Sequence, residues 1–346
     1  MHYTIYSGDP NGYFSIEPNS GAIRTASFLD HEVRASVLLN VQAVSGSPPA
    51  FAHTQVNIVI EDKNDNAPEF DSSTVRISVP ENVGIGSPLY AAHAKDKDSG
   101  NNGVVRYRLF SSASVDSRLF SIDPATGHVT LTRSLDYETA QRHTLLISAT
   151  DAGDPPLSAN LTVLLEVQDV NDNPPVFERS EYSVTVPESA EPESQVVQVT
   201  AVDLDTGNNA RLTYKLVRNN DGIDELKQTQ EIFGVHANTG WVYLKKHLDR
   251  ETRDRYTLKV TATDNGTPAS TTSANIIVTV SDTNDNDPVF TKDEYKFFIE
   301  ENLSRGAFVG TVKATDKDLD NNAAIRYSLI PSNSSFLVNP FTGKLF

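Results

Sequence analysis

Three short acidic motifs recur along this chain in the same order, and this repetition limits the possible folds more than any other feature. The motif Asp-x-Asn-Asp-Asn-x-Pro begins at Asp62, Asp169 and Asp282, so successive copies start 107 and 113 residues apart. An Asp-x-Asp pair and a glutamate that closes an alternating apolar run recur with the same two spacings, at Asp96/Asp98, Asp203/Asp205, Asp316/Asp318, Glu81, Glu188 and Glu301. Three landmarks that shift together indicate a structural repeat of about 110 residues, a common domain size.

Between these landmarks, apolar and polar residues alternate, which is the pattern of a half-buried β-strand. Alternating runs lie at Val75–Val79, Leu161–Val167, Tyr256–Ala262 and Ile276–Val280, and a shorter run recurs at Val105–Leu109, Leu212–Leu216 and Ile325–Leu329. Turn signals that end in glycine recur at Gly21, Gly127, Gly240 and Gly343. About seven short strands per repeat, with no helical periodicity, predict an all-β fold of antiparallel β-sandwiches.

The composition narrows the choice of partners. The 346 residues include 46 Asp and Glu against 29 Lys and Arg, a formal net charge of −17, which argues against nucleic acid and anionic membrane surfaces. There is no cysteine, which excludes a disulfide framework and thiolate metal sites. Clustered carboxylates repel one another and favour a divalent cation, and calcium takes about six to eight oxygen ligands.

Several further motifs occur in a fixed order around each repeat boundary. They include Pro80-Glu81-Asn82, Asp96-Lys97-Asp98, Leu135-Asp136-Tyr137-Glu138, Ala149-Thr150-Asp151 and Asp169-Val170-Asn171-Asp172-Asn173-Pro174. This ordered set resembles the cadherin superfamily over the whole chain, and the cysteine-free, interior-type repeats resemble the giant Fat- or Dachsous-type cadherins. The resemblance implies tandem Greek-key, immunoglobulin-like β-sandwich repeats joined by calcium-binding linkers, and no enzymatic activity.

The resemblance also divides the chain into repeats and linkers. We expect a partial repeat at 1–61, a linker at 62–68, a repeat at 69–168, a linker at 169–175, a repeat at 176–281, a linker at 282–288 and a partial repeat at 289–346. The first partial repeat lacks its early strands and the last lacks its late strands. Because no signal-peptide pattern follows Met1, we expect an internal fragment of a membrane-anchored protein, on the extracellular face of the plasma membrane.

By resemblance, calcium ligands can be carried over residue by residue to three joints between repeats. The first joint takes Asp30, Glu32, Asp62, Asn64, Asp65, Asn66, Asp96, Asp98, Asn102 and Asp151. The middle joint takes Glu81, Asp136, Glu138, Asp169, Val170, Asn171, Asp172, Asn173, Asp203, Asp205, Asn209 and Asp264. The third joint takes Glu188, Asp249, Glu251, Asp282, Asn284, Asp285, Asn286, Asp316, Asp318 and Asn322. Since only the middle joint has its full set, we expect it to bind calcium most tightly.

Other interpretations of the acidic motifs fit less well. Asp98–Gly100 and Asp205–Gly207 match the triplet of aspartic proteases, but each follows another acid instead of lying in an apolar strand. An EF-hand loop starting at Asp96 lacks the acidic twelfth position and the helices. Merely solvated acidic loops do not explain recurrence at a fixed phase. Fibronectin-type repeats lack the acid sets, and immunoglobulin repeats show a Cys…Trp…Cys pattern.

The resemblance to cadherins implies two alternative functions. The first is calcium-dependent cell–cell adhesion, in which calcium at the joints stiffens an extracellular rod that contacts cadherin-family proteins on neighbouring cells, homophilically or heterophilically. The alternative is a non-adhesive calcium-stiffened spacer, or a receptor ectodomain involved in signalling or planar polarity. Sequons predict glycosylation at Asn160, Asn265, Asn302 and Asn333.

Overall fold

The computed structural model describes residues 1–110, 118–217, 230–330 and 335–346, which form two compact units, 1–170 and 171–346. The strands of the first unit are β1 His2–Ser7, β2 Phe14–Ile16, β3 Ile23–Thr25, β4 Ser36–Ser45, β5 Ala50–Val59, β6 Glu69–Phe70, β7 Thr74–Pro80, β8 Pro88–Ala91, β9 Ala94–Lys95, β10 Arg106–Phe110, β11 Phe120–Ile122, β12 His128–Leu131, β13 Arg142–Thr150 and β14 Ser158–Gln168. Those of the second unit are β15 Val176–Phe177, β16 Glu181–Pro187, β17 Gln195–Gln198, β18 Ala201–Val202, β19 Thr213–Val217, β20 Phe233–Val235, β21 Trp241–Leu244, β22 Arg255–Thr263, β23 Thr271–Ser281, β24 Val289–Phe290, β25 Gly310–Thr311, β26 Ala314–Thr315 and β27 Lys344–Leu345.

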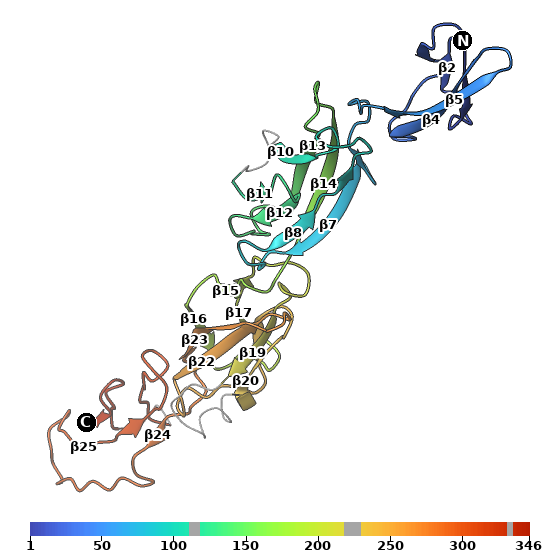
Figure 1. Ribbon diagram of the computed structural model, residues 1–346. Helices are drawn as coiled ribbons and strands as arrows, with labels where there is room; N and C mark the ends of the chain where they lie inside the picture. Colours follow the sequence, from blue (N-terminus) through green and yellow to red (C-terminus); the bar gives the residue numbers. More distant parts are fainter. Residues whose placement is uncertain (111–117, 218–229, 331–334) are drawn as a thin grey trace. The chain divides into compact units, whose positions relative to one another are not determined.

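The two whole repeats have the same sheet topology (Figure 1). The first is built from the sheets β10-β13-β14-β7, β11-β12-β8 and β6-β9, and the second from β16-β23-β22-β19, β17-β21-β20 and β15-β18. All these pairings are antiparallel except β7–β14 and β16–β23, which are parallel. In each of these two pairs, an early strand of the repeat lies beside the last strand, and the two strands run in the same direction. The predicted all-β sandwich is therefore confirmed, with one parallel pair in each whole repeat.

Strand alternation builds the core of each repeat. In β14, Leu161, Val163 and Leu165 are at most 1% exposed, while their neighbours along the strand are more accessible. The predicted run at Ile276–Val280 lies in β23 and is buried in the same alternating manner. Full burial of one such aliphatic side chain contributes about 1.5–3 kcal/mol. The segments 1–61, 69–168 and 176–281 each contain a separate cluster of buried apolar side chains.

A tyrosine hydroxyl and a glycine turn fix the same corner of each repeat. The hydroxyl of Tyr107 accepts the backbone N–H of Ala94 at 2.9 Å, and that of Tyr214 accepts the N–H of Ala201 at 3.0 Å. The predicted turn at Gly127 has φ of 70°, and a Cβ there would lie 2.2 Å from a backbone carbonyl oxygen. A residue with a side chain is strained at this φ and clashes, so the turn requires glycine.

The segments 1–61 and 289–346 show which strands depend on a partner. In residues 1–61, β1 pairs with β4 as β10 pairs with β13. The predicted strand at Ile325–Leu329 is wrong, because these residues are not assigned to a strand. In the whole repeats this segment pairs with β13 or β22, and no equivalent of those strands is present among the described residues of 289–346.

The predicted sequons lie in exposed positions where they are described. Asn160, Asn265 and Asn302 are exposed, whereas Asn333 lies outside the described residues.

Within the described ranges, no helix is long and apolar enough to cross a membrane.

Candidate calcium-binding joints

The buried acids of this chain gather at the ends of the repeats. Among the described residues, the buried carboxylates are 2–8% exposed, and all of them belong to the predicted ligand sets: Glu81, Asp98, Asp151, Glu188, Asp205, Asp264 and Asp318. Asp and Glu are almost never fully buried unless they are paired or bind a metal. Their burial at one phase of the repeat therefore marks the joints as the polar sites of the fold.

At the first joint, the linker is held against the repeat that follows it. Asn66 donates its backbone N–H to Asp98 Oδ2 at 3.2 Å and its side-chain amide to Asp98 Oδ1 at 2.6 Å. Asp62 Oδ2 accepts from the Ser99 N–H at 3.1 Å and from Asn102 Nδ2 at 2.8 Å. The backbone between the Asp-x-Asp pair and Asn102 therefore reaches back to the linker and aligns the acids of both segments.

A third linker side chain enters a loop of the same repeat. Asn64 Nδ2 donates to Asp151 Oδ1 at 3.2 Å and to the Pro155 carbonyl oxygen at 2.6 Å. The amide nitrogen of Asn64 is thus bonded to two protein oxygens, whereas the side-chain oxygen Oδ1 accepts no hydrogen bond.

Buried oxygen atoms at this joint lack a hydrogen-bond partner, and they test whether calcium fits. Asp62 Oδ1, Asn64 Oδ1 and Asp96 Oδ2 are buried and accept no hydrogen bond in the structure. An unsatisfied buried acceptor costs about 1–3 kcal/mol. Calcium binds carboxylate and amide oxygens of this kind, so the residues present fit the ion.

Carboxylates crowd together at the same place. One carboxylate oxygen each from Glu32, Asp65 and Asp98 lies within 4.8 Å of the other two. Desolvation raises the pKa of Glu32, and contact with Asp62 and the charge of Asp65 raise it further. Raised pKa values mean that the ionised form is disfavoured, and a bound cation relieves this repulsion.

The charge distribution of the first joint is uneven. Desolvation raises the pKa of Asp96, with the charges of Asp98 and Asp151 acting in the same direction. Desolvation also raises the pKa of Asp62, but hydrogen bonds to this carboxylate outweigh it, and the net pKa is lowered. The first linker residue therefore stays ionised more readily than the Asp-x-Asp acid it faces.

The residues predicted for the middle joint are divided between the two compact units, and one group of them lies in the first unit. Glu81 Oε1 accepts the backbone N–H of Val170 at 2.9 Å, and its Oε2 accepts that of Tyr137 at 2.6 Å. Asp136 accepts from the N–H and hydroxyl of Thr139, and these bonds lower the pKa of Asp136. Glu81 thus ties the start of the linker to the turn that carries Asp136 and Glu138.

The downstream half of the middle joint lies in the second unit and repeats the geometry of the first joint. Asn171 Nδ2 donates to Asp264 Oδ1 at 3.2 Å and to the Pro268 carbonyl oxygen at 2.6 Å, while Asn171 Oδ1 is buried without a partner. Asn173 Nδ2 donates to Asp205 Oδ1 at 2.8 Å and to Asp172 Oδ1 at the same distance. Asp203 Oδ1 accepts the backbone N–H of Asp205 at 3.0 Å. The backbone N–H of Asn209 donates to the Thr206 carbonyl oxygen at 3.1 Å.

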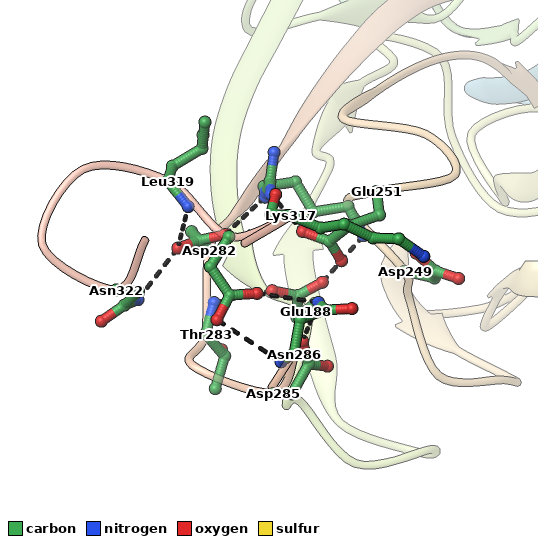
Figure 2. Close-up of polar contacts among 12 residues, drawn as sticks. Glu188, Asp249, Glu251, Asp282, Thr283, Asp285, Asn286, Lys317, Leu319 and Asn322 are labelled. Atoms are coloured by element: carbon green, nitrogen blue, oxygen red, sulfur yellow. Dashed lines mark hydrogen bonds and ion pairs between the residues drawn. The ribbon is translucent and has the colours of Figure 1, made fainter. Parts of the chain in front are cut away.

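The third joint lies within the second unit, and Figure 2 shows its polar contacts. Glu188 Oε1 accepts the Thr283 N–H at 2.6 Å, as Glu81 accepts that of Val170. Asp282 Oδ2 accepts from the Leu319 N–H and from Asn322 Nδ2, both at 2.9 Å. Carboxylate oxygens of Glu188, Glu251 and Asp282 lie within 4.8 Å of one another.

In the third joint, Asn286 and Asp316 make the contacts of their counterparts. Asn284 differs, because Asn64 and Asn171 bond Asp151 and Asp264 in the earlier joints, whereas Asn284 bonds Asp318. Asn286 Nδ2 donates to Asp318 Oδ1 at 2.7 Å and to Asp285 Oδ1 at 2.8 Å. The Asn284 amide, oriented to donate, reaches Asp318 Oδ2 at 3.1 Å, and Asp316 Oδ1 accepts the Asp318 N–H at 2.9 Å.

The acids Asp30 and Asp249 begin equivalent turns. Asp30 Oδ1 accepts the Val33 N–H at 3.0 Å. Asp249 accepts the N–H and hydroxyl of Thr252, which lower the pKa of Asp249. These acids have a structural role in the turn as well as a predicted role as ligands.

Two glycines that the sequence analysis did not select support the linker asparagines. A Cβ at Gly153 would lie 2.3 Å from Asn64 Cγ, and a Cβ at Gly266 would lie 2.2 Å from Asn171 Cγ. Both glycines belong to an Asp-x-Gly-x-Pro pattern that recurs in phase at Asp151 and Asp264. That recurrence is the signal from which they could have been found.

These repeats and joints define a family of proteins. The family model described as "Cadherin domain" matches residues 1–61, 75–168, 182–281 and 295–346. The chain therefore belongs to the cadherin family, a family of non-enzymatic adhesion modules, which confirms the resemblance and the expectation that the chain is not an enzyme.

Individual relatives support the Fat- and Dachsous-type resemblance. The chain is 59% identical over 351 residues to Protein dachsous of Drosophila melanogaster, a match covering 100% of the chain and 10% of that protein. It is 36% identical over 345 residues to Protocadherin Fat 4 of Mus musculus, a match covering 100% of the chain and 7% of that protein. The chain thus spans about a tenth or less of the length of these relatives.

Solved structures share the fold over several repeats. The protocadherin gammaB7 EC3-6 cis-dimer structure superposes with a TM-score of 0.78 at 28% identity, covering 100% of this chain and 84% of that chain. Mouse cadherin-23 EC22-24 gives a TM-score of 0.65 at 30% identity, covering 81% of this chain and 85% of that chain.

Proposed function

We propose that calcium ions bind at the three joints of this chain and stiffen an array of cadherin repeats on the extracellular face of the plasma membrane. The observation that carries the proposal is the set of buried, unpartnered oxygens at the first joint, Asp62 Oδ1, Asn64 Oδ1 and Asp96 Oδ2. The ligands are the three residue sets assigned above, and the repeats are bounded by the linkers 62–68, 169–175 and 282–288.

The donor chemistry favours calcium over other divalent ions. The sets contain carboxylate, side-chain amide and backbone carbonyl oxygens, with no cysteine in the chain. Zinc prefers nitrogen and sulfur ligands, and magnesium keeps several waters in a strict octahedron. Sites rich in carboxylates, supplied by two repeats and a linker, suit the larger and more flexible calcium shell.

Binding at a joint links the two repeats because each ligand set draws on both sides. At the first joint, Glu32 comes from the repeat before the linker, Asp65 from the linker and Asp98 from the repeat after it. An ion held by all three residues restrains the linker backbone and reduces its conformational entropy. Calcium removal is therefore expected to loosen the joints while each sandwich stays folded.

A pair of variants tests calcium binding at the first joint. Asp98→Asn keeps the size of a buried ligand but removes its charge, and isothermal titration of the full chain is expected to lose calcium binding at that joint. The control is Asp71→Asn, which alters an exposed acid that pairs with Lys95 at 3.5 Å. Equal titrations for Asp98→Asn, Asp71→Asn and the wild type would exclude the proposed site.

Small-angle scattering tests the stiffening. The scattering profile of the full chain is expected to broaden when a chelator is added, and proteolysis is expected to accelerate at the three linkers. A profile and a cleavage pattern that do not change with chelator contradict the proposal. Site-resolved titration by NMR addresses the further expectation that the middle joint binds most tightly.

We further propose that the parent protein mediates adhesion through a cadherin-family partner on a neighbouring cell. Support comes from the similarity to Protein dachsous and Protocadherin Fat 4, two large proteins whose extracellular repeats match this chain over its full length. Aggregation of beads coated with the complete ectodomain, alone and mixed with other cadherins, distinguishes homophilic from heterophilic contact.

The second candidate is a receptor ectodomain in which the repeats act as spacers for signalling or planar polarity. It is favoured by 39% identity over 332 residues to the human Cadherin EGF LAG seven-pass G-type receptor 2, of which the chain spans 11%. Beads that never aggregate, with chelator-sensitive stiffness retained, support this alternative.

A further inference from the structure

Arg250 forms ion pairs with Glu251 and Asp282, two carboxylates of the third joint. Figure 2 labels both carboxylates. The Arg250 side chain is only 10% exposed. Arg250 Nε donates to Asp282 Oδ1 at 2.6 Å, and Nη2 donates to Glu251 Oε1 and, at 2.8 Å, to the Lys317 carbonyl oxygen. One guanidinium therefore bonds two predicted calcium ligands and the backbone of the following repeat.

At the first joint, the oxygen that corresponds to Asp282 Oδ1 has no hydrogen-bond partner. His31 occupies the position equivalent to the arginine, and its ring nitrogens lie 2.7 Å from the Ile60 carbonyl oxygen and 3.0 Å from Ser99 Oγ. The oxygen Asp62 Oδ1 is buried there without a partner, while Oδ2 accepts the N–H of Ser99. In the third joint the matching Oδ2 accepts the equivalent N–H, of Leu319, so the oxygen that the arginine bonds is the one that is open in the first joint.

The repulsion among the carboxylates of the third joint explains the effect of the Arg250 guanidinium. Oxygens of Glu188, Glu251 and Asp282 lie within 4.8 Å of one another, and three like charges at this separation repel strongly. A guanidinium offsets one charge through directional, charge-assisted hydrogen bonds. Calcium offsets two charges, but it needs the oxygens themselves at about 2.3–2.6 Å, and the guanidinium blocks that approach.

We propose that Arg250 is a built-in counter-cation of the third joint, which holds Asp282 and Glu251 in the calcium-free state and must leave them before calcium binds. The inference rests on the proposed function, because it takes calcium as the competing ligand. Two consequences follow. Calcium binds the third joint more weakly than it would without the arginine, and the bond to the Lys317 carbonyl keeps the two repeats connected when calcium is absent.

The competition is measured by proteolysis of the full chain in calcium buffers, with cleavage at 62–68 and 282–288 quantified in the same sample by mass spectrometry. In Arg250→Met, the free calcium that half-protects the linker 282–288 is expected to fall about tenfold, since two charge-assisted hydrogen bonds no longer compete. With chelator, cleavage at this linker is expected to be several-fold faster. The linker 62–68 serves as an internal reference that does not change.

Two more variants separate competition from other effects. Arg253→Met removes the same charge from a side chain that donates to the Arg255 carbonyl oxygen and lies 4.7 Å from the ring of Tyr256, and the half-protection point is expected to stay at the wild-type value. Arg250→Tyr introduces the residue type found at Tyr137 in the preceding repeat, is expected to shift like Arg250→Met, and decides the test if the methionine variant does not fold.

The outcomes distinguish this inference from the proposed function. If calcium protects the wild-type linkers but Arg250→Met and Arg250→Tyr change neither the half-protection point nor the chelator-treated cleavage by more than roughly twofold, Arg250 is not a counter-cation. The same conclusion follows if Arg253→Met shifts the point equally. If calcium protects no wild-type linker, the proposed function fails and this inference fails with it.

Discussion

Replacement of Gly153 by alanine is the sharpest test of how the first joint is organised. The new Cβ would lie 2.3 Å from Cγ, 2.4 Å from Nδ2 and 2.7 Å from Oδ1 of Asn64. No real Cβ tolerates such distances, so the Asn64 side chain must leave its position. It then loses its hydrogen bonds to Asp151 Oδ1 and to the Pro155 carbonyl oxygen.

The size of the effect follows from those two bonds. A hydrogen bond to a charged group contributes about 1.5–3 kcal/mol and a neutral one about 0.5–1.5 kcal/mol, so Asn64 loses about 2–4.5 kcal/mol of its attachment to the loop. The displaced Oδ1 is also a predicted calcium ligand. Loss of the group that orients a ligand typically lowers metal affinity by about 10–100-fold, and we expect Gly153→Ala to weaken calcium binding at the first joint by this factor.

The assay compares Gly153→Ala with Gly84→Ala in calcium titrations of the full chain. A Cβ at Gly84 meets only Ser87 Oγ, at an ordinary 3.6 Å, so the control variant is expected to bind calcium like the wild type. The double variant Gly153→Ala/Asn64→Ala is expected to bind no more weakly than Asn64→Ala, since both changes remove the same contact. Additive losses, or a Gly153→Ala titration equal to that of Gly84→Ala, refute the reasoning.

Three further predictions concern the repeats themselves. Tyr214→Phe removes the acceptor of the Ala201 N–H and is expected to destabilise its repeat by about 1–3 kcal/mol in urea unfolding, and an unchanged midpoint excludes a role for this bond. Ile276→Ala, in a position that is 0% exposed, is expected to cost about 2–5 kcal/mol while the calcium titration of the first joint stays the same. Burial lowers the pKa of His143, so the folded state binds fewer protons, and stability present above the unfolded pKa of about 6.5 is lost as the pH falls toward the lower folded value. His143→Phe is expected to make the melting temperature less dependent on pH over this interval, and a pH dependence equal to that of the wild type contradicts the prediction.

Sequence periodicity was sufficient for the elements that carry their own pattern. The alternation from Leu161 to Val167 predicted the buried face of β14, because side chains along a strand alternate between its two faces. The phase of the acids likewise placed Asp98 and Asp151 at the same end of a repeat, where both are buried. These features are local or repeated, so one sequence is enough to reveal them.

The sequence pattern did not predict features that depend on contacts between residues far apart in the sequence. The run Ile325–Leu329 has a strand pattern but no strand to pair with among the described residues. The role of Gly153 depends on the approach of Asn64, which lies far away in the sequence. Arg250 occupies the variable position of the motif Leu-Asp-x-Glu, which begins at Leu29, Leu135 and Leu248. Its contact with Asp282 becomes visible only in three dimensions.

The parallel pairs β7–β14 and β16–β23 determine how each repeat responds to mechanical tension. Each pair spans seven register positions, from Thr74↔Thr162 to Pro80↔Gln168 and from Glu181↔Asn275 to Pro187↔Ser281. A pull on the two linkers of a repeat drags its early strand and its last strand in opposite directions along their common axis. The ladder is then loaded in shear, so its hydrogen bonds resist together and do not open one after another. Under tension along the chain, these two repeats are therefore expected to resist unfolding at the pairings of β7 with β14 and of β16 with β23.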